Sequence, residues 1–288
     1  MADIEERTGT VNSGDVTLFY RAFGKPSQTP GKAPILLMHG TNYYDSTDYI
    51  EMARMLAVDR EVAAYDKRGW GRSGWSPSKD YSVDAHMGDI SVVLGHLGWA
   101  KPVLYGHSSS GRLAVAFAAS HPDKVLKLII GDSGFARDED AQKPGTRTTG
   151  NPPLTFKSVE AAMAHFARIA NPPRMAKDPV RAAEGLTKSG DELVLRRDPD
   201  HVNREPIGEG AGLPRRPAGT VWDDLPNVKC PTIIIRGLRS DRYPPEIIER
   251  IKKLRPDFAW AAVDSQHDMA FQARDALVAE IRKFIGEA

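Results

Sequence analysis

The chain has 288 residues, of which 41% are hydrophobic, enough for one large domain with a sizeable core or for a domain that carries an insertion. With 39 basic and 38 acidic residues the net charge is +1, so the bulk charge gives no indication of a nucleic acid or an anionic membrane as partner. Cys230 is the only cysteine, which excludes an intrachain disulfide framework.

The N-terminal half alternates between strand-like and helix-like segments. The alternation in VTLFYRAFG (residues 16–24), after the turn NSGD, predicts a half-buried strand. Continuous hydrophobic runs predict strands covered on both faces. Such strands are expected at ILLMHG (35–40), EVAAYD (61–66), PVLYGHS (102–108) and VLKLIIGDSG (125–134), and helices at 48–57, 81–98 and 110–122. This order predicts an α/β fold with a mostly parallel sheet of about eight strands flanked by helices.

The alternation stops over residues 136–221. This segment is rich in Pro, Arg and Asp, contains NPP twice and has one clear amphipathic run, VEAAMAHFARIA (159–170). It contains no long buried strand, so we expect an inserted helical cap, with residues 1–135 and 222–288 forming the core. The α/β pattern then resumes, with strands expected at 230–237 and 258–263 and helices at 244–256 and 269–285.

Three consecutive serines lie between the strand PVLYGHS and the helix that follows it. A sharp strand-to-helix turn needs small residues two positions before and after its central residue, because the strand end and the helix start nearly collide there. Gly106 and Ser110 flank Ser108 in this way, whereas the other two serines each have a large residue at one of these positions. We therefore predict Ser108 as a nucleophile and the Ser109 amide, at the helix start, as an oxyanion donor. The alternative is a serine-rich helix cap without chemistry.

A serine hydroxyl needs a base to remove its proton, and the base needs an acid that orients it. Of the eight histidines, His267 is the one that follows the last predicted strand and precedes the last helix. Loops after parallel strands open at one edge of the sheet, so His267 is expected beside Ser108. The acid is expected from another such loop. Asp241, in RGLRSDRYPP, is preferred because its loop has room to curve towards His267, and Asp132 is the alternative.

The chain resembles the α/β-hydrolase superfamily over nearly its whole length. The resemblance rests on the chain order Ser108, Asp241, His267 and on three motifs. MHGT (38–41) is similar to the family's oxyanion loop, which implies the Thr41 amide as a second oxyanion donor. DKRGWGRS (66–73) resembles the family's D-x-R-G-x-G-x-S turn. The serine run resembles its G-x-S-x-G elbow, with a serine in place of the second glycine.

The resemblance implies a serine hydrolase that cleaves an ester, lactone or amide bond of a small molecule through an acyl-enzyme. A serine nucleophile argues against the dehalogenase and epoxide-hydrolase branches, which attack with an aspartate. The alternatives are a carbon–carbon bond hydrolase of the same fold and a non-hydrolytic ligand-binding, lyase or cofactor-independent oxygenase member. Tyr43, Tyr44 and His107 are candidates for the substrate pocket.

The remaining motifs give no indication of a cofactor or a metal. GWGRSG (69–74) matches G-x-G-x-x-G, but Pro77 and polar residues follow where a dinucleotide site needs a helix. The histidines lack paired spacing, and one cysteine cannot form a thiolate cluster. The arginines of the cap are interpreted as solvated surface, with a clamp for an acidic substrate as the alternative.

The N-terminal sequence MADIEERTGT lacks the hydrophobic core of a signal peptide, and no hydrophobic run is long enough to cross a bilayer. We therefore expect a cytoplasmic monomer or homodimer with a small-molecule substrate, and neither nucleic acid nor membrane as partner.

Overall fold

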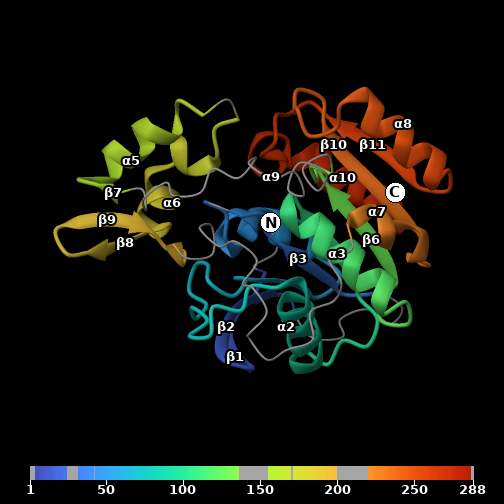
Figure 1. The fold of residues 1–288 in the computed structure, drawn as a ribbon, viewed down its shortest axis with the longest axis horizontal. Coiled ribbons are helices and arrows are strands. Elements are labelled where there is room, and N and C mark those ends of the chain that lie inside the picture. Colours follow the sequence, from blue (N-terminus) through green and yellow to red (C-terminus); the bar gives the residue numbers. More distant parts are fainter. Residues whose placement is uncertain are drawn as a thin grey trace.

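The computed structural model describes residues 4–24, 32–41, 43–135, 155–169, 171–199 and 220–286. Within them an eight-stranded sheet has the order β1-β2-β4-β3-β5-β6-β10-β11 and runs through the core of the molecule between layers of helices (Figure 1). β2 pairs antiparallel with both β1 and β4, and all other neighbours are parallel. The predicted α/β fold with a mostly parallel sheet is confirmed.

The strand and helix bounds follow the predicted pattern closely. The strands of the large sheet are β1 Glu6–Ser13, β2 Val16–Phe23, β3 Ile35–Met38, β4 Val62–Tyr65, β5 Val103–His107, β6 Lys127–Gly131, β10 Thr232–Gly237 and β11 Ala259–Val263. The helices of the core are η1 Ser46–Tyr49, α1 Ile50–Leu56, α2 Val83–His96, α3 Ser109–Ser120, α7 Val221–Asp224, η4 Leu225–Asn227, α8 Pro245–Leu254, α9 Met269–Gln272 and α10 Arg274–Ile285. One helix was expected over 269–285; it is interrupted at Ala273, whose φ of −142° and ψ of 41° are not helical.

The parallel strands bury both faces, as their continuous hydrophobic runs predict. In β3, Leu36 and Met38 belong to one hydrophobic cluster and Ile35 and Leu37 to another, because successive side chains of a strand point to opposite faces. Residues of α2, α3 and α8 complete the first cluster, and residues of α1 and α10 complete the second. The loops after these strands therefore meet at one edge of a sheet that is buried on both sides.

The edge strand β1 was not predicted. Its sequence, ERTGTVNS, is polar, and its residues alternate between partly buried and exposed. It pairs with β2 through a turn at Gly14, where φ is 59°. Main-chain hydrogen bonds to β2 hold this strand at the sheet edge, so hydrophobicity alone does not reveal it.

The described part of the cap combines helices with a small sheet. It contains α5 Val159–Phe166, η2 Arg174–Ala176, α6 Pro179–Glu184 and the strands β7 Thr155–Phe156, β8 Leu186–Ser189 and β9 Glu192–Leu195. The strands form an antiparallel sheet in the order β7-β9-β8, which the expected helical cap did not include. Gly190, with φ 61°, begins the two-residue turn between β8 and β9, and each of these strands has only four residues, too few for a clear alternation. The cap has a hydrophobic cluster of its own around Phe156 and Phe166.

The boundaries 1–135, 136–221 and 222–288 stay a prediction, because residues 136–154 and 200–219 lie outside the described residues. The cap elements lie to one side of the core in Figure 1, with β8 and β9 furthest from it.

Several polar contacts join the cap to the core, and those of Arg181 and Arg174 lie near the sheet edge. Arg181 of α6, 1% exposed, donates from Nε and Nη2 to the two carboxylate oxygens of Asp48, both at 2.8 Å, and its Nη2 lies 3.1 Å from Asp45 Oδ2. The backbone amide of Arg174 donates to Asp268 Oδ2 at 2.9 Å. We call the Arg181–Asp48 pair the cap clamp.

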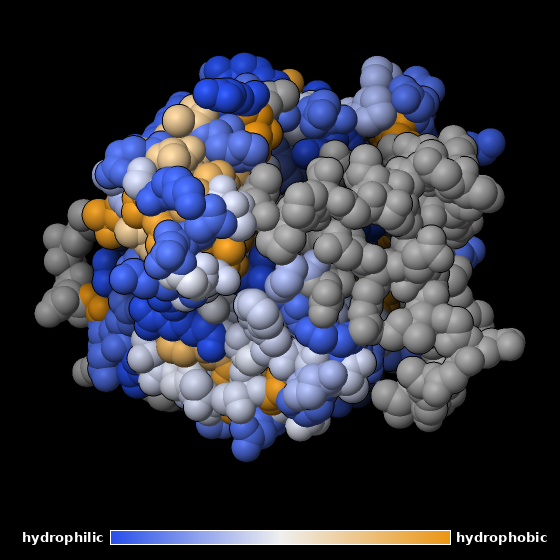
Figure 2. Space-filling model, turned by 60° about the vertical axis from the view of Figure 1, so that its left-hand side comes forward, coloured by the Kyte–Doolittle hydropathy of each residue, from blue (hydrophilic) through white to orange (hydrophobic). Residues whose placement is uncertain are grey.

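Figure 2 shows a face on which hydrophobic residues occur in groups interspersed with hydrophilic ones. The most exposed large hydrophobic side chain of the described residues is Val180 of α6, at 68%. In the part of the chain that the structure describes, no helix is both long and hydrophobic enough to cross a bilayer.

Substitution of the cap clamp tests its contribution to stability. Arg181→Met leaves the buried Asp48 without its counter-charge, so we expect the free energy of unfolding to fall by about 3–5 kcal/mol. The double variant Asp48→Asn/Arg181→Met should be more stable than Arg181→Met alone. Arg174→Met is the matched control, because its side-chain pair with Asp178 is partly exposed and is worth at most about 1 kcal/mol. Urea unfolding followed by circular dichroism measures all three, and equal losses in the two single variants would contradict the clamp.

Candidate active site

Ser108 stands in a strained turn between β5 and α3. Its φ of 55° and ψ of −123° lie outside the regions that L-residues normally occupy. Asp132 and Lys79 are the other residues besides glycine with positive φ in the described chain. Such strain persists where the surrounding structure enforces it, often at functional sites.

The residues around Ser108 leave no room for larger side chains. A Cβ atom on Gly106 would lie 2.3 Å from the backbone oxygen of Ser110, and one on Gly111 would lie 2.6 Å from the Ser133 Cβ. Ser110 is fully buried, and its hydroxyl donates to the backbone oxygen of His39. These contacts agree with the close approach from which Ser108 was chosen.

His267 reaches the nucleophile turn from the loop between β11 and α9. Its Nε2 lies 3.0 Å from Ser108 Oγ, and its Nδ1 lies 2.6 Å from Asp132 Oδ2. The His267 residue is 3% exposed and Asp132 is fully buried. Ser108, His267 and Asp132 thus form a continuous hydrogen-bonded chain, with the geometry of a nucleophile, a base and an orienting acid.

Asp132 occupies the acid position, and the expectation of Asp241 was wrong. Asp132 follows β6, which lies between β5 and β10, and its amide donates to the Ile235 carbonyl at 2.8 Å. Its φ of 44° turns the chain directly after the strand. The Gly237 amide and the Ser240 hydroxyl donate to its two oxygens at 3.1 and 2.6 Å.

Asp241 lies away from His267. Its side chain is 69% exposed and pairs with the adjacent Arg242, with Asp241 Oδ1 and Arg242 Nε 3.4 Å apart. The loop after β10 does reach the site, but it contributes Ser240 to the acid instead of an acid of its own. Loop length, the reason for preferring Asp241, did not determine which carboxylate faces the ring.

Burial raises the pKa of Asp132 to about 6, against the hydrogen bonds from Ser240 and Gly237, which lower it. The carboxylate is therefore charged above this pH, as an acid that stabilises an imidazolium must be.

The predicted oxyanion donors both belong to segments next to Ser108. Ser109 is the first residue of α3, where an amide has no acceptor within its own helix. Thr41 follows Gly40, and a Cβ on Gly40 would lie 3.1 Å from the Ser108 Cβ. The loop after β3 is therefore packed against the nucleophile, although the role of both amides stays a prediction.

The three candidates for the substrate pocket have different positions. His107 is 2% exposed; its Nε2 donates to the His267 backbone oxygen at 2.9 Å, and the two rings are 4.7 Å apart. Burial lowers the pKa of His107 to about 3, so its ring is neutral. His107 therefore lies against His267, and the substrate contact expected for it stays a prediction.

Tyr44 is 4% exposed and makes edge contacts with the rings of His107 and His267, at 5.1 and 6.2 Å. Tyr43 contacts the ring of Phe166 in the cap at 5.5 Å. Tyr44 therefore packs behind the base and Tyr43 lies between core and cap, and a substrate contact for either stays a prediction.

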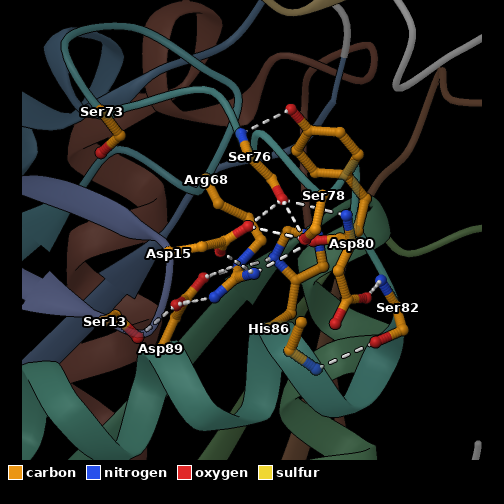
Figure 3. A network of polar contacts seen from close by, with 12 residues as sticks. Ser13, Asp15, Arg68, Ser73, Ser76, Ser78, Asp80, Ser82, His86 and Asp89 are labelled. Atoms are coloured by element: carbon orange, nitrogen blue, oxygen red, sulfur yellow. Dashed lines mark hydrogen bonds and ion pairs between the residues drawn. The ribbon is translucent and has the colours of Figure 1, made fainter. Parts of the chain in front are cut away.

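The turn after β4 is anchored by a buried polar network (Figure 3). Arg68 donates from Nε and Nη2 to the two oxygens of Asp89 in α2, both at 2.7 Å, and Ser13 at the end of β1 donates to Asp89 at 2.7 Å. Arg68 Nη1 also donates to the Asp80 carbonyl at 3.0 Å. The D-x-R-G motif thus fixes the turn against α2 and β1.

The remaining motifs are GWGRSG and the arginines of the cap. GWGRSG forms a turn with positive φ at Gly69 and Gly71, and the next helix, α2, begins only at Val83. In the described part of the chain no group of three His, Cys, Asp or Glu residues is placed to hold a metal ion. Of the cap arginines, Arg174 pairs with Asp178, and Arg196 Nε donates to the Leu186 carbonyl.

A family model described as alpha/beta hydrolase fold matches residues 33–273, so the chain belongs to this family. Lipase LipV from Mycobacterium tuberculosis is 27% identical over 266 residues, covering 87% of this chain and 92% of the relative. N-formylmaleamate deformylase from Pseudomonas putida is 27% identical over 271 residues, covering 91% and 89%. The crystal structure of E-2-(acetamidomethylene)succinate hydrolase is similar with a TM-score of 0.78 at 21% identity, covering 98% of this chain and 99% of that chain. The predicted class, a hydrolase of this fold, is confirmed.

Asparagine variants test the acid position. Asp132→Asn keeps the shape of the side chain but removes the charge that holds His267, so we expect turnover of 4-nitrophenyl acetate to fall by roughly 10⁴-fold, the loss known for the same change in a serine protease. Asp241→Asn, in an exposed loop position, should retain most activity. Steady-state kinetics decide between them, and the opposite ranking would contradict the observed hydrogen bonds.

Ser240→Ala tests whether the Ser240 hydroxyl lowers the pKa of Asp132. The Ser240 hydroxyl stabilises the charged form of Asp132, so its removal should raise the pKa of that carboxyl above its value of about 6. We expect kcat/KM to fall as the pH drops through this range, and the fall to begin at a higher pH in Ser240→Ala. Asp241→Asn, one residue further along the loop, is the control. An unshifted profile would show that Asp132 does not contribute to the acidic limb.

Proposed function

We propose that the chain hydrolyses a carboxylic ester, lactone or amide of a small molecule through a covalent acyl-serine intermediate. The observation that carries this proposal is the bonded chain from Ser108 Oγ through the His267 ring to Asp132, with distances of 3.0 and 2.6 Å. Each member lies after a different strand, at the edge of the sheet where such loops meet.

In the first half of the reaction, Ser108 Oγ forms a bond to the substrate carbonyl carbon while its proton passes to His267 Nε2. Asp132 accepts the Nδ1–H of the ring, so it selects the tautomer in which Nε2 is free to take that proton, and it stabilises the imidazolium that forms. His267 then gives the proton to the leaving alcohol or amine, and the bond to that group breaks.

In the second half, water takes the place of Ser108. His267 removes a proton from the water, the oxygen attacks the acyl carbon, and the Ser108 oxygen leaves with the proton that His267 returns. The amides of Thr41 and Ser109 stabilise the negative oxygen of both tetrahedral intermediates, and one such donor is worth about 2.7–4 kcal/mol in a comparable enzyme.

A comparison of substrates with different bonds identifies the type of bond that is cleaved. Relatives named as a lipase and as a deformylase support ester and amide substrates equally. A panel of acyl esters of increasing chain length, with matched amides, lactones and a carbon–carbon diketone, ranks these classes by kcat/KM. The cap over the sheet edge supports a small molecule as substrate. A cytoplasmic location and a monomeric or dimeric state stay predictions.

Covalent labelling tests the proposal independently of the substrate. A fluorophosphonate should label Ser108 in the folded wild-type protein and fail to label Ser108→Ala. No labelling of the folded wild-type chain would contradict the nucleophile and favour a non-hydrolytic member of the fold.

A double mutant tests whether Ser108 and His267 act together. We expect Ser108→Ala and His267→Ala each to lower kcat by several orders of magnitude, on the order of 10⁴–10⁶-fold, because each removes the same proton-transfer step. The double variant should then be little worse than either single variant, with all three unfolding at similar urea concentrations. Losses that multiply would show that the two residues act in separate steps.

A further inference from the structure

A buried lysine lies next to the nucleophile turn, and the mechanism above does not use it. Lys67 follows β4 at the edge of the sheet where the active site lies, and it is 1% exposed. Its Nζ is 3.4 Å from the hydroxyl of Ser109, the residue directly after Ser108, and 4.8 Å from the centroid of the Trp70 ring. Its amide donates to His39 Nε2 at 3.0 Å.

This ammonium group lacks a counter-ion among the described residues. Its single hydrogen bond there goes to the neutral Ser109 hydroxyl, although an ammonium has three donors. The neighbouring carboxylate, Asp66, is directed elsewhere and accepts from the amides of Ser46 and Arg72 at 2.7 and 2.8 Å. The network in Figure 3 fixes the next residue, Arg68, so the Lys67 backbone cannot shift easily towards solvent.

Two positive groups near Lys67 Nζ, the Arg112 guanidinium and the start of α3, favour a negative charge there, and burial leaves the ammonium itself poorly compensated. Burial lowers the pKa of Lys67 to about 7, and the guanidinium of Arg112 acts in the same direction. The first turn of α3, which contains Ser109, adds the positive end of a twelve-residue helix. A methionine has a similar length and would fill this volume without the cost of burying a charge, so packing does not explain a lysine here.

We propose that Lys67 Nζ and Ser109 Oγ form a subsite for a carboxylate of the substrate, next to the scissile carbonyl. The inference rests on the proposed function and narrows the substrate to an ester or amide that carries a second, negatively charged carboxyl group. Ser108 and Ser109 are both partly exposed, so a ligand reaches the subsite from the side of the nucleophile. The carboxylate supplies the missing counter-ion, and the dry surroundings strengthen the pairing because little water screens it.

Matched ester pairs measure this preference. On the acyl side we compare 4-nitrophenyl hydrogen glutarate with methyl 4-nitrophenyl glutarate, and on the leaving-group side 4-acetoxybenzoate with methyl 4-acetoxybenzoate. The wild-type protein should prefer the anionic ester in at least one pair, by about tenfold or more in kcat/KM, as expected for a charged hydrogen bond. Lys67→Met should reduce that preference by about tenfold or more, and Ser109→Ala, which keeps the amide, by a smaller factor.

Two further measurements keep the proposal testable if Lys67→Met does not fold. In the wild-type protein the anionic preference should decline as the pH rises through about 7, because Lys67 loses its proton there. Ser109→Ala supplies the second variant. Lys124→Met, at an exposed lysine, is the matched control and should leave the preference unchanged.

The possible results separate the subsite from the proposed function. No anionic preference in either pair, or an equal loss on both members of each pair in Lys67→Met, overturns the subsite and leaves the serine mechanism standing. Turnover that persists in Ser108→Ala contradicts the proposed function instead.

Discussion

The close approach of the end of β5 to the start of α3 is the constraint on which the rest of the site depends. Ser108 adopts φ 55° where Gly106 lets β5 and α3 pass within contact distance, and Gly111 lets α3 approach Ser133 and Ile130 at the end of β6. A side chain at Gly106 would push α3 away from β5, and one at Gly111 would push it away from the end of β6. The same approach raises Ser108 out of the sheet edge, places the first amide of α3 beside it, and brings the loop after β3 into contact through Gly40. The positions of the proposed nucleophile and of the predicted oxyanion donors are therefore consequences of one packing arrangement.

The burial of charged groups at this edge lowers the stability of the fold, and these groups lie where the proposed chemistry takes place. Asp132 is fully buried, and burial raises its pKa even though two donors stabilise its charge. Lys67, beside Ser109 of the nucleophile turn, is buried without a carboxylate partner among the described residues. Hydrophobic residues of similar size would stabilise the core more, since buried charges lose hydration that their partners only partly replace. The structure retains these charges where the reacting groups of a hydrolase meet.

The cap is joined to this edge by polar contacts as well as by packing. Arg181 reaches from α6 to Asp48, and Asp268, the residue after the base, accepts a hydrogen bond from the cap backbone at Arg174. Tyr43 contacts Phe166 from the core side. A displacement of the cap would therefore also move the loop that positions His267. Access to the site and the geometry of the site are thus linked.

The sequence by itself determined the features that depend on local pattern. Continuous hydrophobic runs and helical spacing predicted the α/β core, and the need for small neighbours identified Ser108 among three serines. His267 followed from its place after the last strand, because every parallel strand ends at the same edge. Tertiary structure alone decided which carboxylate meets the ring. Asp132 directly follows β6, the strand between β5 and β10, and its backbone turns there at positive φ, whereas the loop that carries Asp241 directs that side chain into solvent.

Strand β1, the small cap sheet and the position of His107 were equally hidden from the sequence. The first two are held largely by main-chain hydrogen bonds, which leave little trace in composition, and the third depends on a contact between residues 160 positions apart. Residue type and spacing reveal which groups reach the edge of a sheet. Which of them touch is decided by side-chain directions that form only when the strands and loops are packed together.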